Sequence, residues 1–360
     1  MMQACKILLM CCIVAISAFA GEPRPTQDLQ PRTLILPARD LTLDEVLKEL
    51  EKQTGNTVAD LRRTNRDNPK LTLTTNTFWK TLDAIGAQTK IGFSAYQEGG
   101  GVALVDAPYR RLTTVYPSVF RIALKRVAVS RDDETQTHYA NLTLDAAWEP
   151  RFQPLFLNLE SATVIAGKRT EKLERQAMRS VAGMGATEIE LRLPAPERAV
   201  LQIDSLKGEL KVIGAPKMLE FAFEKIGPVT PKAPREAKSQ EGVKVSVTEV
   251  KQLATRWTVD LQIVNPAGAI IPLESFQSWL DNNRLWLTWT DPQTKKVRTL
   301  EPVGETQEGN NQTMKIHFDF TARGNTPLPA KNADVTLRYR TPNRVAAFTV
   351  PFGFKDLPLP

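Results

Sequence analysis

Cysteine is nearly absent from this sequence, and its few copies all stand close to the N-terminus: Cys5, Cys11 and Cys12. Residues 1–20 carry a single charge, Lys6, and then an apolar run that ends in the small-x-small pattern Ala18-Phe19-Ala20. This pattern predicts a secretory signal peptide that is cleaved after Ala20, because the apolar run is too short to span a membrane. The mature chain then has no cysteine, which excludes disulfides, a thiolate nucleophile and a cysteine-bound metal.

Long hydrophobic runs are missing as well. After residue 21, no stretch approaches the roughly 18 apolar residues that a membrane helix needs. The formal charge of +7 is a small excess of cations spread along the chain, whereas a nucleic-acid site would cluster them. We therefore expect an exported protein of the periplasm or the extracellular space, with no transmembrane segment in the mature chain and no nucleic-acid partner.

Patterns of catalytic side chains are scarce, and the sequence holds only two histidines. His138 follows the acidic loop 132–134, and His317 shares a strand face with Asp319. Two ligands are too few for a metal site, so we interpret His317 as an exposed strand residue with a charge partner. There is no G-x-S-x-G elbow, and the glycines at 99–101 precede a strand rather than a helix, which does not suit phosphate. The sequence thus predicts no catalytic, cofactor-binding or metal-binding residue.

The clearest pattern that is present is the stretch LTLDEVLKELEKQTGNTV, residues 41–58, which predicts a helix followed by a strand. Its apolar residues recur at i, i+3, i+4 and i+7 on one helical face: Leu43, Val46, Leu47 and Leu50. Thr42 and Glu45 have the spacing of a capping box, and Gly55 is typical of a helix end. The opposite face carries charged residues that we expect to be in water: Asp44, Glu45, Lys48, Glu49, Glu51 and Lys52.

A second amphipathic helix is predicted from about residue 76, with inward side chains at Phe78, Leu82 and Ile85. Short strands are expected before and between the helices and in a hairpin after them, at 33–36, 57–61, 70–74, 91–96 and 101–106. The resulting order, β-α-β-β-α-β-β, describes a small domain over residues 21–107 in which two helices cover one face of a sheet.

One set of mostly apolar residues in this domain carries a family resemblance: Leu43, Val46, Leu47, Leu50, Gln53, Thr54, Gly55, Val58, Leu71, Leu73, Leu82, Ile85, Thr89 and Ile91. With them, residues 33–106 resemble the short N-terminal domain of secretins and TonB-dependent receptors. The resemblance implies a periplasmic docking module that contacts partner proteins through sheet edges and helix faces, without catalysis. A receptor would continue into a plug and a barrel, and a secretin into a ring-forming pore, and residues 108–360 suit neither.

From residue 108 on, apolar and polar residues alternate with the period of β-strands. We expect an antiparallel β-sandwich over 108–227, a proline-rich and charged linker over 228–242, and a second sandwich over 243–360, in which only residues 272–283 suggest a helical turn. The predicted fold class is α+β: the small β-α-β-β-α-β-β domain followed by two antiparallel β-sandwich domains. This later part also resembles exported bacterial proteins of unassigned activity that join such a docking domain to β domains.

Tryptophans gather in the second predicted sandwich, at Trp279, Trp286 and Trp289. In the strand RLWLTWTD, Trp289 shares the apolar face, whereas Trp286 lies among threonines on the other face. An exposed Trp286 would offer a flat ring on which a sugar could stack, so it is our candidate ligand-binding residue. The alternatives are that the 272–283 turn covers this ring or that it packs across strands.

The sequence therefore predicts a non-enzymatic cell-envelope protein that acts in protein–protein interaction or assembly, with an envelope or periplasmic protein as its partner. The docking surface would be the free sheet edge and the charged helix face of residues 41–106, with strand addition at the edge as the binding mode. One alternative is binding of envelope polysaccharide through Trp286. Another, an enzyme of unfamiliar design, would require a deep pocket with converging carboxylates.

Overall fold

The structure is a computed structural model that describes residues 29–64, 66–97, 100–215, 218–264, 283–309, 313–324, 326–330, 333–342 and 346–360. The predicted signal peptide, the first residues of the predicted hairpin turn, Trp279 and nearly all of the predicted turn at 272–283 lie outside the described residues. Of the residues that the structure describes, 56% lie in strands and 8% in two helices. The predicted α+β class is therefore wrong, and the protein is mostly β. The reason is that helical periodicity is confined to two short stretches, whereas strand alternation continues through the described parts of the rest of the chain.

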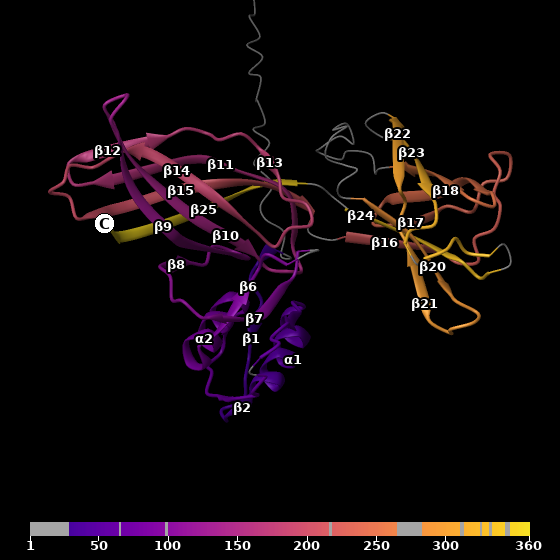
Figure 1. Ribbon diagram of the computed structural model, residues 1–360, viewed down its shortest axis with the longest axis horizontal. Helices are drawn as coiled ribbons and strands as arrows, with labels where there is room; N and C mark the ends of the chain where they lie inside the picture. The colour runs from indigo at the N-terminus through magenta and orange to yellow at the C-terminus, as the bar shows by residue number, and fades with distance from the viewer. Residues whose placement is uncertain are drawn as a thin grey trace, which may run out of the picture.

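Both helices belong to a small unit, residues 33–108, which we call the α/β unit (Figure 1). Helix α1 spans Leu43–Thr54 and α2 spans Phe78–Thr89. The strands form two antiparallel pairs and one mixed sheet. The pairs are β1 (Thr33–Leu34) with β5 (Asn76–Thr77) and β2 (Leu41–Thr42) with β4 (Lys70–Leu71). The mixed sheet has the order β3-β7-β6, with β3 (Val58–Asp60), β7 (Val102–Pro108) and β6 (Ile91–Ser94). The strands that were expected to form a single small sheet are thus divided among separate pairings.

Helix α1 has the ends that its sequence predicts. The Thr42 side chain accepts a hydrogen bond from the Glu45 backbone N–H, and the Glu45 carboxylate accepts one from the Thr42 backbone N–H, which completes the capping box. Gly55 ends the helix with φ of 75°, a left-handed conformation that glycine adopts without steric cost. Leu43, Val46 and Leu50 are buried, and the charged face is turned to solvent.

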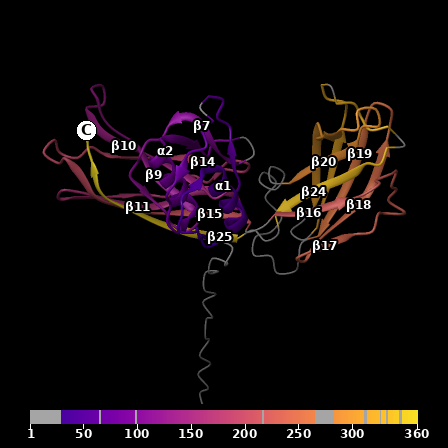
Figure 2. The ribbon, with the colours of Figure 1, turned by 90° about the horizontal axis from the view of Figure 1, so that it is seen from below.

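A larger unit follows, which we call the first sandwich (Figure 2). One of its sheets has the order β14-β10-β9-β8, with β8 (Thr114–Val115), β9 (Phe120–Asp132), β10 (Thr137–Trp148) and β14 (Ala186–Pro194). The other has the order β12-β11-β15-β25, with β11 (Gln153–Ala166), β12 (Arg169–Leu173), β15 (Gln202–Ala215) and β25 (Ala346–Pro358), and β13 (Arg179–Ser180) also pairs with β11. Alternate residues of both sheets meet in one apolar core, as in sheet-on-sheet packing.

The second sandwich is built from the described strands that lie between residues 218 and 342. One sheet has the order β16-β24-β20-β21, with β16 (Met218–Phe223), β20 (Arg284–Thr290), β21 (Val297–Leu300) and β24 (Thr336–Pro342). The other has the order β17-β18-β19-β23-β22, with β17 (Lys238–Gln240), β18 (Val243–Gln252), β19 (Trp257–Val264), β22 (Gly304–Gly309) and β23 (Thr313–Phe320). Its core is a separate cluster, with Trp257, Phe221 and Tyr339 among its largest buried side chains.

Strand β25 shows how the two sandwiches are connected. It comes last in the chain, yet it pairs with β15 of the first sandwich from Gly214↔Ala346 to Gln202↔Pro358. In the second sandwich, β16 and β24 pair from Met218↔Pro342 onward. The second sandwich is therefore inserted between two neighbouring strands of the first, as the yellow strand within the first sandwich shows (Figures 1 and 2). The expectation that residues 243–360 form one sandwich does not hold for this last strand.

The segment 228–242, expected as an extended linker, lies along the second sandwich. Val229 pairs with Val250, the Arg235 backbone N–H donates to the Val247 carbonyl at 3.0 Å, and β17 pairs with β18. Strand β16, which falls within the range 108–227 expected for the first sandwich, likewise pairs in the second sandwich, and the boundary at residue 107 remains a prediction. No helix among the described residues is long and apolar enough to cross a membrane.

Candidate functional site

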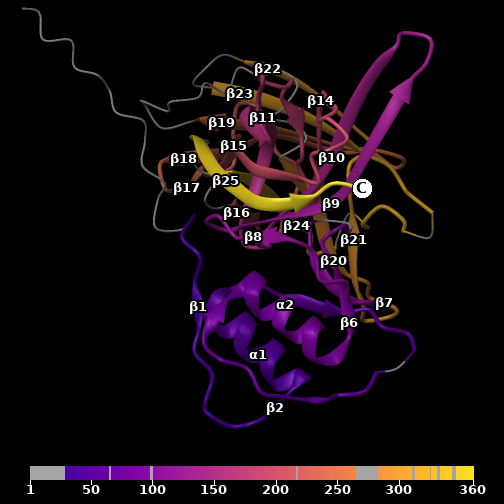
Figure 3. The same cartoon turned by 90° about the vertical axis from the view of Figure 1, so that its left-hand side faces the viewer.

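The α/β unit packs against one end of the first sandwich, below the strands in Figure 3. Its apolar core extends into the sandwich, because Ala147 and Ala186 belong to the same cluster as the helices. The Trp79 indole N–H donates a hydrogen bond across the junction to the Val119 carbonyl at 3.0 Å. The position of the unit is therefore defined by buried contacts.

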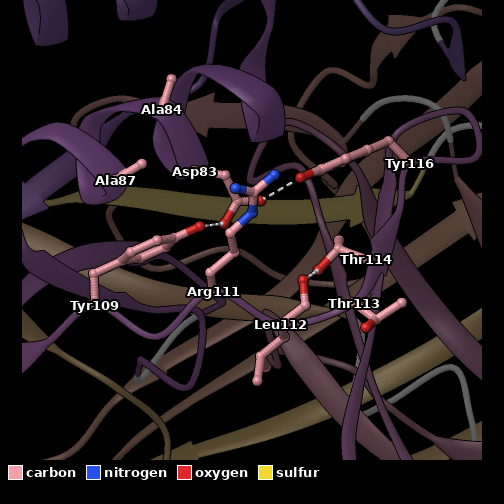
Figure 4. A pocket seen from close by; sticks show the side chains of 9 residues that line it. All are labelled: Asp83, Ala84, Ala87, Tyr109, Arg111, Leu112, Thr113, Thr114 and Tyr116. Carbon is pink, nitrogen blue, oxygen red and sulfur yellow. Dashed lines mark hydrogen bonds between the residues drawn. The ribbon is translucent and has the colours of Figure 1, made fainter. Parts of the chain in front are cut away.

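A largely buried carboxylate lies at the centre of this junction. Asp83 of α2 accepts hydrogen bonds from the Tyr109 hydroxyl at 2.9 Å and from the Tyr116 hydroxyl at 2.7 Å (Figure 4). The Arg121 guanidinium of β9 adds two more, from Nε at 2.9 Å and from Nη2 at 3.1 Å. The Arg121 side chain is 6% exposed and that of Asp83 11%, so this ion pair is largely removed from water. A carboxylate with about four acceptor positions is saturated by these four donors.

The pKa values of the groups that contact Asp83 indicate that these groups keep one protonation state at neutral pH. Burial, followed by the negative charge of Asp83, raises the pKa of Tyr109 to about 12, and burial also raises the pKa of Tyr116. Burial alone would lower the pKa of Arg121, but its hydrogen bonds with Asp83 leave that pKa above its usual value. General acid–base catalysis works best with a pKa near the working pH, and these three groups are shifted away from neutrality. These three groups are therefore unsuited to proton transfer at neutral pH, and their contacts stabilise the junction.

A cavity of about 710 Å³ opens beside this cluster. Helix α2 and the segment that follows β7 line it, with these residues (Figure 4): Asp83, Ala84, Ala87, Tyr109, Arg111, Leu112, Thr113, Thr114 and Tyr116. We call it the junction pocket. It combines two tyrosine side chains, small apolar side chains and an exposed cation, Arg111. This composition is suited to binding a ligand that has both apolar and charged groups.

A second polar network joins the same two units. The Asn56 amide donates to Glu149 Oε2 at 2.9 Å and accepts from the Arg151 backbone N–H at 2.9 Å. Arg151 Nε donates to the same Glu149 oxygen at 2.6 Å. Glu149 is 1% exposed, and burial raises its pKa despite the neighbouring guanidinium. A third contact, between the Tyr96 hydroxyl and Asp145, lies at another point of the junction.

Trp286, the residue proposed from the sequence to bind a ligand, lies on the outer face of β20 and is half-buried. The guanidinium of Arg284 lies 5.5 Å from its ring centroid, and Arg338 is its neighbour across the strand pair. Part of the ring is therefore next to a cation. Trp289 is buried in the core, as its position on the apolar strand face predicts.

The two histidines lie far apart in the fold, on β10 and β23. His317 has its Nδ1 within hydrogen-bond distance of Asp260 on β19 and its Nε2 3.4 Å from Asp319. It lines a cavity of about 1030 Å³ over the outer face of β18, β19, β23 and β22, whose side chains carry charges of both signs. Among the described residues, no three His, Cys, Asp or Glu side chains are placed to hold a metal ion.

The sequence did not single out the residues of the junction pocket. Asp83 lies between the predicted inward residues Leu82 and Ile85, and it is the only acidic residue of α2. A single acidic residue beside the apolar face of a helix is the sequence feature that could have indicated a polar contact at the junction. Its partners Tyr109, Tyr116 and Arg121 lie in loops and a strand. Their spacing along the sequence follows no motif from which their contact with Asp83 could be predicted.

Comparison of the sequence with protein-family models and with curated proteins finds no match in either.

Proposed function

We propose that this is a non-catalytic protein of the cell envelope that binds another protein through its α/β unit. The observation that carries the proposal is the way this unit is held: buried networks at Asp83 and Glu149 fix it on the first sandwich, while the charged face of α1 remains exposed. A surface that is held in a fixed orientation loses little conformational entropy when a partner binds.

The edge of the mixed sheet adds to this surface. Strand β3 pairs only with β7 among the described residues, and its Ala59 and Asp60 are exposed. An exposed edge strand can pair with an extended segment of a partner. The resemblance of residues 33–106 to the docking domain of secretins and TonB-dependent receptors supports the same role. The pattern of residues 1–20 supports export to the periplasm or beyond.

Site-specific photo-crosslinking in living cells tests this proposal. A photoreactive amino acid replaces Lys48 on the exposed face of α1 in one variant and Lys207 on β15 of the first sandwich in the matched control. We expect one discrete crosslinked protein from position 48 and none from position 207. Identical crosslinking patterns at both positions would remove the proposal. Crosslinking is preferred to deletion of the α/β unit, because deletion would uncover Ala147, Ala186 and the buried Glu149.

A second candidate function is binding of envelope polysaccharide through Trp286. It is favoured by the half-buried indole on an outer sheet face, next to Thr288 and to guanidinium groups that can donate hydrogen bonds to sugars. The test is retention of the mature protein on immobilised envelope polysaccharide, compared between Trp286→Ala and the control Thr290→Ala on the same strand. Lower retention of Trp286→Ala alone is the expected result, and equal retention of both variants removes this function.

A further inference from the structure

The surface around the junction pocket has an unusual charge balance. Its lining residues belong to two segments of the chain, residues 78–96 with α2 and residues 107–127 after β7. They contain seven cations and a single acidic residue, Asp83; the cations are Lys80, Lys90, Arg110, Arg111, Arg121, Lys125 and Arg126. In a chain whose net charge is only +7, such a local excess identifies this surface as cationic.

Some of these cations are already neutralised. Arg121 binds Asp83, and Lys125 and Arg126 are paired with Glu188 and Glu190 on β14. The others are exposed and form no ion pair within the described part of the chain: Lys80, Lys90, Arg110 and Arg111. Arg111 lines the pocket, and Lys80 and Lys90 each contact a lining residue, so a ligand there meets positive charge that is not yet compensated.

Their positions relative to the pocket follow from individual contacts. Arg111 lines the cavity. The Lys80 ammonium lies 5.7 Å from the ring centroid of Tyr116, and Lys90 reaches the carbonyl of Ala87, a lining residue, at 2.9 Å. The cations are therefore at the margin of the pocket, where they remain hydrated but close enough to pair with an entering carboxylate.

The interior of the pocket does not repel a carboxylate strongly, because the charge of Asp83 is already paired with Arg121 and saturated with hydrogen bonds. The walls offer tyrosine rings and apolar carbons of Ala84, Ala87 and Leu112. Tyrosine and arginine are enriched among the residues that contribute most to protein–protein binding. A volume of about 710 Å³ is enough for a short chain segment rather than a folded surface.

We propose that the junction pocket binds an acidic peptide segment of a partner protein. Carboxylates of that segment pair with Arg111 and Lys80, and its apolar side chains pack on Tyr109 and Tyr116. The proposal rests on the proposed function of the α/β unit in protein binding, and it adds the chemistry of the partner. The surface is formed jointly by α2 and the start of the first sandwich, so it is distinct from the α1 face and the β3 edge.

The test uses a fluorescent pentapeptide with phenylalanine between two pairs of glutamates, and its counterpart with glutamine in place of glutamate. Binding to the full mature protein is measured by fluorescence anisotropy at low and high salt. We expect saturable binding of the acidic peptide, weaker binding at high salt because the charges are exposed, and no binding of the glutamine peptide. Arg111→Glu should weaken binding at least about tenfold.

Arg198→Glu is the matched control, because Arg198 is also exposed but lies in the loop after β14, at the end of that strand opposite to Ala186. Equal unfolding midpoints of both variants show that the fold is intact, and Arg198→Glu should bind as the unchanged protein does. The proposal is overturned if Arg111→Glu binds the acidic peptide as tightly as the unchanged protein does. It is also overturned if the unchanged protein shows no saturable binding of that peptide below about 1 mM. Binding of polygalacturonate in preference to the peptide overturns it in favour of an anionic polymer. If position 48 still crosslinks one protein in any of these cases, the proposed function stands without this pocket.

Discussion

Asp83 and Arg121 show how single residues decide the arrangement of this molecule. Both side chains are largely buried, and each is the other's charge partner at the boundary of two units. Separating a buried pair by removing one member is costly, because the remaining charge stays out of water without compensation. The pair therefore stabilises the α/β unit on the sandwich, independently of what that unit binds.

Replacing Asp83 by alanine should lower the free energy of unfolding by about 3–5 kcal/mol, since Arg121 is then buried without a partner and two tyrosine hydroxyls lose their acceptor. Urea unfolding measures the change. Asp133→Ala is the control: Asp133 pairs with Arg131 in the exposed β9–β10 turn, and its loss should change the free energy by no more than about 0.5 kcal/mol. Similar effects of both substitutions would show that the junction is not held by this pair.

Tyr109 should make stability depend on alkaline pH. Its pKa is raised from 10.0 to about 12 in the folded protein, mainly by burial, so the unfolded chain loses this proton first as pH rises. The stabilisation is complete below pH 10 and is lost between pH 10 and about 12. Urea midpoints measured from pH 8 to 12 should fall less steeply for Tyr109→Phe than for the unchanged protein. Tyr116 shares the Asp83 acceptor and its pKa is raised mainly by burial and in part by Tyr109, so its response adds to the difference between the two curves. Identical slopes would contradict the assignment.

Helix α2 is the element on which the junction depends. It places Trp79 against Val119, Asp83 against Arg121, and Gly86 under the ring of Tyr109. An ideal Cβ on Gly86 would lie 2.3 Å from the Tyr109 ring, a distance that no pair of carbon atoms tolerates without movement. Glycine in this helix interior is therefore explained by the close approach of a neighbouring segment.

Gly86→Ala separates helix propensity from packing. Propensity alone would stabilise α2 by about 1 kcal/mol, because alanine is a better helix former than glycine. The clash with Tyr109 acts in the opposite direction and is made with a ring packed in the junction, which cannot rotate away freely. We expect a lower thermal midpoint than that of the unchanged protein. A raised midpoint would show that Tyr109 moves at little cost and that the pocket is adaptable.

For the whole molecule, the insertion of the second sandwich between β15 and β25 is the dominant feature. Strand β25 contributes Val350, Phe352, Phe354 and Leu357 to the first core. Burying four such side chains contributes about 6–12 kcal/mol, which is comparable to the entire stability of about 5–15 kcal/mol of a typical domain. The first sandwich is thus completed only when the last strand of the chain has returned to it.

Two chains of different design test this topology. Truncation after Pro342 removes β25 and should leave the first sandwich unfolded and sensitive to protease. Replacing residues 215–345 by Asn-Gly instead joins β15 to β25 directly, and the pair Gly214–Ala346 should then close a hairpin with a two-residue Asn-Gly turn. We expect this shorter protein to be monodisperse in gel filtration and resistant to protease. The insertion would be contradicted if the truncated chain were folded and resistant to protease while the directly joined chain were not.

The sequence by itself determined the local elements of this protein. Helix α1 forms where Thr42 and Glu45 supply a capping box and Gly55 a stop, because these groups act on the residues next to them. Strand formation after residue 108 follows from alternation with period two, and the burial of Trp289 follows from its strand face. These signals are local and depend on few distant contacts.

Only the tertiary structure decided which elements are partners. Alternation specifies a strand but not its neighbour, so nothing near Ala346 in the sequence indicates that it pairs with Gly214. The predicted α+β class is wrong for a related reason: the helix–strand pattern is strong locally but occupies only a small part of the chain. The junction at Asp83, Tyr109 and Arg121 likewise exists only in three dimensions, because a buried charge and its donors come together from separate elements through packing.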